Sequence, residues 1–369
     1  MKFRNLLTLT FMAAASAVAA QSVLPFNRVE TKEVMKRVAD WQIENPGTHD
    51  ALDWTNGALY VGMADWAAIS DETDHNDKYW EWMKKKLGAR QFQMGDRMYN
   101  ADDLTVGQAN IDLYKKYGNK RILWPTTARI DWVIEHLEEN SLDFRVQTEY
   151  IKDRWSWCDA LFMAPPVFAK LYRLTGEKRY IKFLNREYKA SYDYLFDKEE
   201  NLFYRDSRYF DMKEANGKKV FWGRGNGWVI AGLVEILKAI PENDKNRRFY
   251  EEVLVKLSNS LVDLQCADGY WHASLLDPDS YPAPETSATG FIVYGLAYGV
   301  HTGLLDADRF VPVITKGWKA MLAAVESNGK LGHVQPIGSD PKKVTREMTE
   351  VYGVGAFLAA GSEIYYMVK

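Results

Sequence analysis

A lone aspartate, Asp159, stands among aromatic and apolar residues in the stretch WSWCDALFMAPP, residues 155–166. Moving a carboxylate out of water costs free energy and raises the pKa of the carboxyl group. A carboxyl group that keeps its proton near neutral pH is suited to general acid catalysis. Alternatively, Asp159 caps the following helix, with Pro165 or Pro166 in the first turn of that helix. The stretch by itself leaves both roles open.

Two adjacent carboxylates, Asp102 and Asp103, precede the stretch LTVGQANIDLY. Aspartate is a favoured N-cap residue, so one of the two is expected to cap the helix that follows. The other carboxylate would then be available for another role. A second carboxylate beside Asp159 is what the hydrolysis of a glycosidic bond requires.

The stretch WGRGNGW, residues 222–228, places Arg224 among glycines that allow close approach to the backbone. A guanidinium at the start of a helix faces an unfavourable helix dipole, so a functional role is favoured over a structural one. Such a group would bind a carboxylate through two hydrogen bonds.

Tryptophan and tyrosine are abundant, with 13 and 21 residues, and their rings can bind sugar rings as well as fill a core. With so many tryptophans, packing is the more frequent role of any single one. The sugar-contact candidates are Trp54, Trp155, Trp222 and Trp228.

Two further polar residues have competing explanations. His272, in the turn DGYWH, could be a wall residue or a proton carrier at the substrate. Glu285, in PETSATG, could contact a ligand, but the stretch is more typical of a helix cap formed by Thr286 or Ser287.

About twelve helices must position these residues, because helical periodicity is common and strand patterns are scarce. Charged, amphipathic helices alternate along the chain with helices rich in glycine, alanine and aromatic residues. The predicted helices span residues 31–44, 55–69, 76–89, 102–118, 125–138, 158–175, 177–195, 223–240, 246–265, 286–303, 307–323 and 344–365.

This alternation predicts an all-α fold, an (α/α)6 barrel with amphipathic helices outside and apolar ones inside. A single barrel over residues 21–369 would form the catalytic domain. Six short polar and aromatic stretches, including those of Asp102, Asp159 and Arg224, stand at or just before the starts of the inner helices, which lie at one end of such a barrel. We therefore expect them to meet at one mouth, where helix N-termini favour an anionic ligand.

Residues 1–20 have a short basic start, an apolar stretch and small residues before Gln21, which is typical of a signal peptide. Export to the periplasm or the medium is expected. No later stretch is apolar for the eighteen or so residues that a membrane span needs. A formal net charge of -3 gives no electrostatic reason to expect nucleic-acid binding.

Cys158 and Cys266 are too few for a disulfide framework, and whether they pair with each other is open. A zinc site built on cysteines is not expected, and the six histidines lack ligand spacing. The spacing of these residues therefore gives no indication of a zinc site.

Taken together, the motifs resemble the unsaturated uronyl hydrolases of glycoside hydrolase families 88 and 105, and family 105 more closely. The resemblance covers about residue 30 to the C-terminus. WSWCDALFMAPP and WGRGNGW are its most specific motifs, supported by DWTNGALYVG, DDLTVGQ, QCADGYW, ETSATG and YGVGAFLAAGSE.

The resemblance implies an (α/α)6 barrel without metal or organic cofactor. It implies that a carboxylic acid protonates the C4=C5 double bond of a terminal unsaturated uronic acid, left by a polysaccharide lyase. Water then adds at C5, and the hemiketal opens and releases the rest of the oligosaccharide.

Residue by residue, the resemblance implies that Asp159 is the acid/base and Asp102 the second aspartate. It places Arg224 and Trp228 at the substrate. Many members carry a histidine where this chain has Arg205, in NLFYRDSRYF. An arginine there could bind a carboxylate or a sulfate.

The sequence thus predicts a secreted hydrolase of oligosaccharides that end in an unsaturated uronic acid. Asp103 and His272 complete the expected substrate contacts. One alternative is a glycosidase on a saturated uronide or another sugar, with Asp159 and Asp102 as a conventional pair. Another is a sugar-binding barrel without catalysis.

Overall fold

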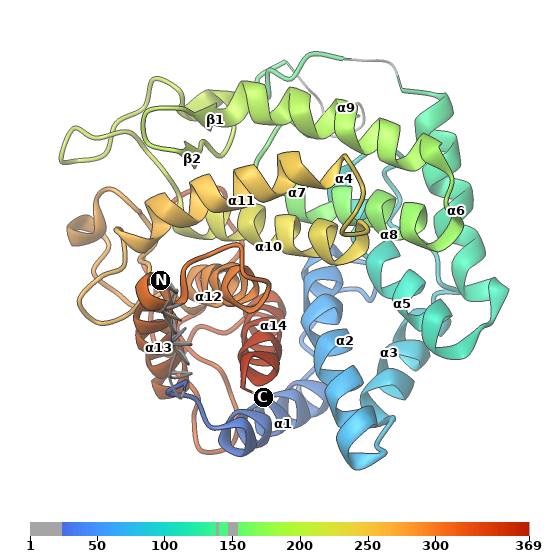
Figure 1. Ribbon diagram of the computed structural model, residues 1–369, viewed down its shortest axis with the longest axis horizontal. Coiled ribbons are helices and arrows are strands. Elements are labelled where there is room, and N and C mark those ends of the chain that lie inside the picture. The colour runs from blue at the N-terminus through green and yellow to red at the C-terminus, as the bar shows by residue number, and fades with distance from the viewer. Residues whose placement is uncertain (1–23, 138–139, 147–153, 369) are drawn as a thin grey trace, which may run out of the picture.

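The computed structural model describes residues 24–137, 140–146 and 154–368, and its helices form an inner and an outer layer (Figure 1). The expected (α/α)6 barrel is confirmed. The inner helices are α2 (Trp54–Asp74), α5 (Gly107–Tyr117), α8 (Pro165–Thr175), α10 (Gly223–Ala239), α12 (Thr286–His301) and α14 (Val351–Met367). The outer helices are α1 (Arg28–Glu44), α3 (Lys78–Gly88), α6 (Lys120–Glu135), α9 (Lys178–Leu195), α11 (Arg247–Val262) and α13 (Ala307–Ala323).

The inner helices form a closed ring, in the order α2, α5, α8, α10, α12, α14 and back to α2. Glycines let these helices approach closely. A Cβ atom at Gly62 of α2 would overlap the carbonyl oxygen of Gly355 of α14, and one at Gly232 of α10 would overlap the carbonyl oxygen of Leu161. The small residues of the inner helices therefore set the width of the ring.

Two predicted helices are interrupted. The predicted helix 102–118 is divided into α4 (Ala101–Leu104) and α5, and the predicted helix 158–175 into α7 (Ala160–Met163) and α8. The second break comes where Pro165 begins α8, because proline lacks the N–H that would continue the hydrogen bonding of α7.

The last inner helix begins at Val351, seven residues later than predicted. The preceding segment uses its backbone for other bonds: the Val334 N–H donates to Met348 O at 3.0 Å, and the His333 N–H donates to Arg346 O at 3.3 Å. Backbone groups of residues 346–348 are thus tied to a neighbouring loop.

The two described strands, β1 (Phe196–Asp197) and β2 (Leu202–Phe203), form an antiparallel hairpin after α9. Just after β2, the Cys158 N–H donates to the Arg205 carbonyl oxygen at 2.8 Å. This bond places Arg205 beside the start of α7. Short 3-10 turns follow at η1 (Ser207–Tyr209) and η2 (Pro278–Ser280).

Aromatic contacts show that inner helices start at a common end. Trp54 at the start of α2 stacks on Tyr352 at the start of α14, with ring centroids 5.4 Å apart, and meets Trp228 of α10 edge-on at 6.0 Å. We call this end the mouth. In the described ranges, no helix has the length and apolar content needed to cross a bilayer.

Candidate active site

Asp159 lies directly before α7, and its carboxylate makes no capping hydrogen bond within the described part of the chain. Its Oδ2 atom lies 3.5 Å from Arg205 Nε and accepts from Cys158 Sγ at 3.4 Å. The side chain is 11% exposed. The capping alternative is therefore not the role that this structure gives Asp159. The surroundings also differ from the expected purely apolar ones, because a guanidinium is adjacent.

Asp102 lies in α4 and shares an electrostatic environment with Asp159 and Arg205. Burial raises the pKa of Asp102 to about 7, with the charges of Asp159 and Asp103 adding to it and those of Arg97 and Arg205 opposing it. Asp102 therefore holds a proton up to neutral pH. The raised pKa of Asp102 was not expected from the sequence.

Neither Asp102 nor Asp103 is the N-cap that we expected of one of them. Asn100 caps α4, and its side chain accepts from the Asp102 N–H at 3.0 Å. Asp103 binds Arg97 through three donors, the backbone N–H at 2.6 Å, Nε at 3.0 Å and Nη2 at 2.9 Å. Arg97 Nη2 in turn lies 3.8 Å from Asp102 Oδ2. Asp103 thus positions the arginine that faces Asp102.

Arg224 begins α10 as predicted, but its side chain is buried, with 1% of the residue exposed. Its Nη1 donates to Gln335 O at 2.5 Å and its Nη2 to Pro336 O at 3.0 Å. The guanidinium lies over the rings of Trp222 and Tyr352. In this structure Arg224 fastens the loop around Gln335 to the start of α10 rather than presenting its donors at the mouth.

The candidate tryptophans separate into two groups. Trp228 and Trp155 are buried in the core, where Trp228 contacts Phe162 and Phe291 and Trp155 packs on the aromatic rings of α8 and α9. Trp222 is also buried, and its indole N–H donates to Gln335 Oε1 at 3.1 Å. Trp54 is partly exposed at the mouth, so it can present part of its ring to a ligand.

His272 lies in the turn between α11 and α12, and its Nε2 contacts Asp268 Oδ2 at 2.9 Å. Burial alone would lower the pKa of His272, but Cys266 and Asp268 beside it raise that pKa to about 9. Gly223 packs on the backbone of this turn, since a Cβ atom there would overlap the His272 carbonyl oxygen. His272 therefore belongs to a polar cluster of its own turn.

Both cysteines are free within the described ranges, Cys158 buried beside Asp159 and Cys266 partly exposed. Cys158 and Cys266 therefore do not form a disulfide with each other.

Sequence reasoning missed Gln335, which connects the starts of three inner helices. Its N–H donates to Glu285 Oε1 at 3.0 Å, and its carbonyl oxygen accepts from Tyr352 Oη at 2.5 Å as well as from Arg224. Glu285 is the cap of α12, the structural role that was favoured, although Thr286 and Ser287 had been the expected caps. The loop around Gln335 has no periodicity that could have identified it.

Comparison with known proteins identifies the family of this chain. The family model described as Glycosyl Hydrolase Family 88 matches residues 27–368. An Unsaturated 3S-rhamnoglycuronyl hydrolase of Alteromonas sp. (strain LOR) is 36% identical, with 94% of this chain and 89% of the relative covered.

Two solved structures are similar along nearly their whole length. A glycosyl hydrolase family 88 protein from Bacteroides vulgatus superposes with a TM-score of 0.82 at 27% identity, covering 93% of this chain and 100% of the other. A protein described as a polysaccharide lyase superposes with a TM-score of 0.81 at 31% identity, covering 92% and 97%. With its helical barrel and the aspartates at the mouth, the chain belongs to glycosyl hydrolase family 88.

Proposed function

We propose that this protein removes a terminal unsaturated uronic acid from oligosaccharides produced by a polysaccharide lyase. The observation that carries the proposal is the pair of Asp102 and Asp159 beside Arg205 at the mouth, in a family 88 chain. The 36% identical relative supports it, because that protein is named for the hydrolysis of an unsaturated glycuronyl group.

In the proposed reaction a carboxyl proton is transferred to C4 of the double bond, and water adds at C5. The resulting hemiketal opens, and the bond to the rest of the oligosaccharide breaks. Asp159 is the acid/base in this proposal. Asp102 supplies the second carboxyl, and burial raises its pKa to about 7.

Arg205 is the proposed contact for an anionic group of the substrate. Its Nε lies 3.5 Å from Asp159, and its guanidinium lies over the ring of Phe144. Arg224 is the weaker candidate for this contact, because its terminal nitrogens donate to backbone carbonyls. Among substrates, we propose that sulfated oligosaccharides with an unsaturated uronic acid are preferred, in line with the name of the relative.

The test is the ultraviolet absorbance of the conjugated unsaturated uronate. Lyase products of a sulfated rhamnose-containing polysaccharide, of pectin and of a glycosaminoglycan are each incubated with the protein. Loss of absorbance on at least one substrate is expected, fastest on the sulfated one. Unchanged absorbance on all three would contradict the proposed reaction.

A second candidate function is eliminative cleavage, because one similar structure is described as a polysaccharide lyase. A lyase creates the conjugated double bond that the proposed hydrolase removes. The same assay on intact polysaccharides therefore separates the two by sign: absorbance rises for a lyase and stays constant for the proposed hydrolase. A glycosidase on saturated uronides would release sugar without any change in absorbance.

We also propose export, on the basis of residues 1–20, which lie outside the described residues and outside the family match that starts at residue 27. The one-domain organisation over 21–369 likewise stays a prediction. N-terminal sequencing of the protein from the periplasm or medium should give a chain beginning at Gln21. A chain that keeps residues 1–20 in the cytoplasm would contradict this proposal.

A further inference from the structure

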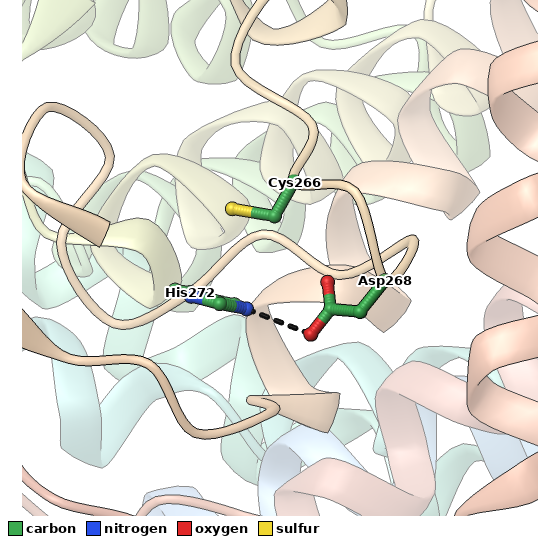
Figure 2. Close-up of side chains that lie close together, drawn as sticks. All are labelled: Cys266, Asp268 and His272. Carbon is green, nitrogen blue, oxygen red and sulfur yellow. Dashed lines mark hydrogen bonds and ion pairs between the residues drawn. The ribbon is translucent and has the colours of Figure 1, made fainter. Parts of the chain in front are cut away.

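The turn between α11 and α12 brings together Cys266, Asp268 and His272 (Figure 2). The cysteine sulfur, a carboxylate oxygen and a ring nitrogen all lie within 4.8 Å of one another. Asp268 Oδ2 and His272 Nε2 lie 2.9 Å apart and form a hydrogen bond. The three residues come from a single stretch, CADGYWH, and take no part in the proposed reaction.

The turn that carries these side chains is fixed by backbone bonds. The Cys266 N–H donates to Tyr270 O at 2.9 Å, and the Gly269 N–H donates to Cys266 O at 3.0 Å. Gly269 has a φ of +95°, which a side-chain-bearing residue rarely adopts. This geometry holds Cys266 and Asp268 on the same side as His272.

The aromatic residues of the turn anchor it to the outer helices. Tyr270 Oη donates to Ala320 O of α13 at 2.5 Å, and the Trp271 indole N–H donates to Leu261 O of α11 at 2.7 Å. The side chains of Cys266, Asp268 and His272 are therefore held near one another before any ligand binds.

We propose that Cys266, Asp268 and His272 bind one divalent cation of the zinc class. Thiolate, imidazole and carboxylate are the donors that zinc prefers, whereas calcium and magnesium prefer oxygen donors alone. Zinc bonds of about 2.0–2.3 Å place neighbouring donor atoms roughly 3.5 Å apart, within the span of this cluster. Three protein donors leave one coordination position for water.

The exposure of the three side chains suits such a site. His272 is 8% exposed and Cys266 partly exposed, so these donors are shielded, while the Asp268 side chain is 40% exposed and leaves an entry from solvent. An entering ion would replace the Asp268–His272 hydrogen bond, and the thiol and the imidazole would lose their protons on binding.

The proposed site has a structural consequence at the mouth. Gly223 begins α10 in contact with the His272 carbonyl oxygen, and its N–H donates to Ala273 O at 2.8 Å. A cation that cross-links the turn would therefore stabilise the surface on which α10 begins. We expect it to raise the melting temperature.

The test uses the full chain, freed of metal with a chelator and titrated with Co²⁺ alone, followed by Zn²⁺ in competition. We expect one Co²⁺ per chain, with a thiolate-to-cobalt charge-transfer band that Zn²⁺ abolishes. Cys266→Ser should remove the band. Cys158→Ser is the matched control, because this second free thiol is buried beside Asp159, and it should keep the band.

Asp268→Asn provides a milder variant, since its exposed side chain is tolerant of substitution. It should weaken Co²⁺ binding by more than the roughly 10–100-fold that outer-shell partners cost. Melting curves without metal show that each variant is folded. Binding that is absent in the wild type, or a band that survives Cys266→Ser, would overturn the proposal. No substrate is involved, so this result is independent of the proposed hydrolysis.

Discussion

Carboxylates at the two ends of the inner ring differ in how they are paired with cations. At the mouth, Asp102 and Asp159 share the field of Arg205, and burial raises the pKa of Asp102 to about 7. At the far end, Asp112 is half-buried and Glu363 is buried, but their lysine partners hold the pKa of each carboxyl below its usual value, against the effect of burial.

The far end is paired almost completely. Lys170 Nζ lies 2.6 Å from Asp112 Oδ2 and 3.1 Å from Glu235 Oε2. Lys238 Nζ lies 2.8 Å from Glu363 Oε1 and 3.2 Å from an oxygen of Asp65, whose pKa burial raises in spite of this lysine. These groups, apart from Glu363, line a cavity of about 620 Å³.

The two ends therefore differ in what their buried carboxylates do: those at the far end form ion pairs, and Asp102 at the mouth holds a proton. Pairing with lysine at the far end compensates the cost of removing Asp112 and Glu363 from water, although not fully that of Asp65. At the mouth, the charges of Arg97 and Arg205 compensate only part of the cost of burying Asp102, so its carboxyl keeps a proton up to a higher pH. Removing the Asp159 charge at the mouth should therefore affect chiefly the chemistry, and removing the Lys170 charge at the far end chiefly the stability.

Asp159→Asn should give the largest effect, because it removes the proposed proton donor. We expect the rate of absorbance loss on the preferred substrate to fall by about 10²–10⁴-fold. The free energy of unfolding should change little, because Arg205 loses its contact with Asp159 but keeps its ion pair with Asp206 at 2.7 Å. Urea unfolding measures this second quantity. A variant of full activity would remove Asp159 from the chemistry.

Lys170→Met should show the reverse pattern at the far end. It leaves the half-buried Asp112 and the buried Glu235 without their shared cation, which should lower the free energy of unfolding by about 3–5 kcal/mol. The matched control is Lys115→Met, because Lys115 pairs with the same Asp112 but is 45% exposed, and it should cost less than about 1 kcal/mol. The folded Lys170→Met variant should keep its activity. Equal losses in the two variants would remove the contrast between the ends.

Asp102→Asn should change how stability depends on pH. Between pH 3.8 and about pH 7, the folded chain keeps a proton on Asp102 that the unfolded chain has released. The free energy of unfolding of the wild type therefore falls as the pH rises through this range. Asparagine lacks this titration. Relative to the wild type, the variant should therefore gain roughly 2–4 kcal/mol between pH 4 and pH 7. Parallel stability curves would show that the pKa of Asp102 is ordinary.

Gly62→Ala tests whether the close packing of α2 against α14 in the inner ring stabilises the fold. The added methyl group would overlap the Gly355 carbonyl and should cost about 1–3 kcal/mol. Ala68→Val, on the exposed face of the same helix, is the control and should cost less than about 1 kcal/mol. Similar losses in both would show that α2 and α14 can separate without penalty.

Asp103→Asn should have the smallest effect. It weakens the hydrogen bonds to Arg97 and should cost about 1 kcal/mol in the free energy of unfolding. If Asp103 only positions Arg97, the KM for the preferred substrate should stay within a few-fold of wild type. A large rise in KM with unchanged stability would instead make Asp103 a direct substrate contact.

Most of the architecture could be predicted from the sequence, because each helix has its own periodic pattern. The predicted helix 307–323 coincides with α13, and the alternation of amphipathic and apolar segments gave the correct inner and outer layers. The errors lie where distant contacts compete with local preference. Residues 344–350 were predicted helical, but their backbone bonds to the loop of residues 333 and 334 delay the start of α14.

The sequence by itself determined which residues stand at the starts of the inner helices, since that depends only on position along the chain. Tertiary structure decided what surrounds each of them. Arg205 is far from Asp102 in sequence, yet its charge acts on both Asp102 and Asp159. The Arg224 side chain instead donates to backbone carbonyl oxygens. The pKa of a carboxyl depends on burial and on charges a few ångströms away, and both are set by how the helices pack.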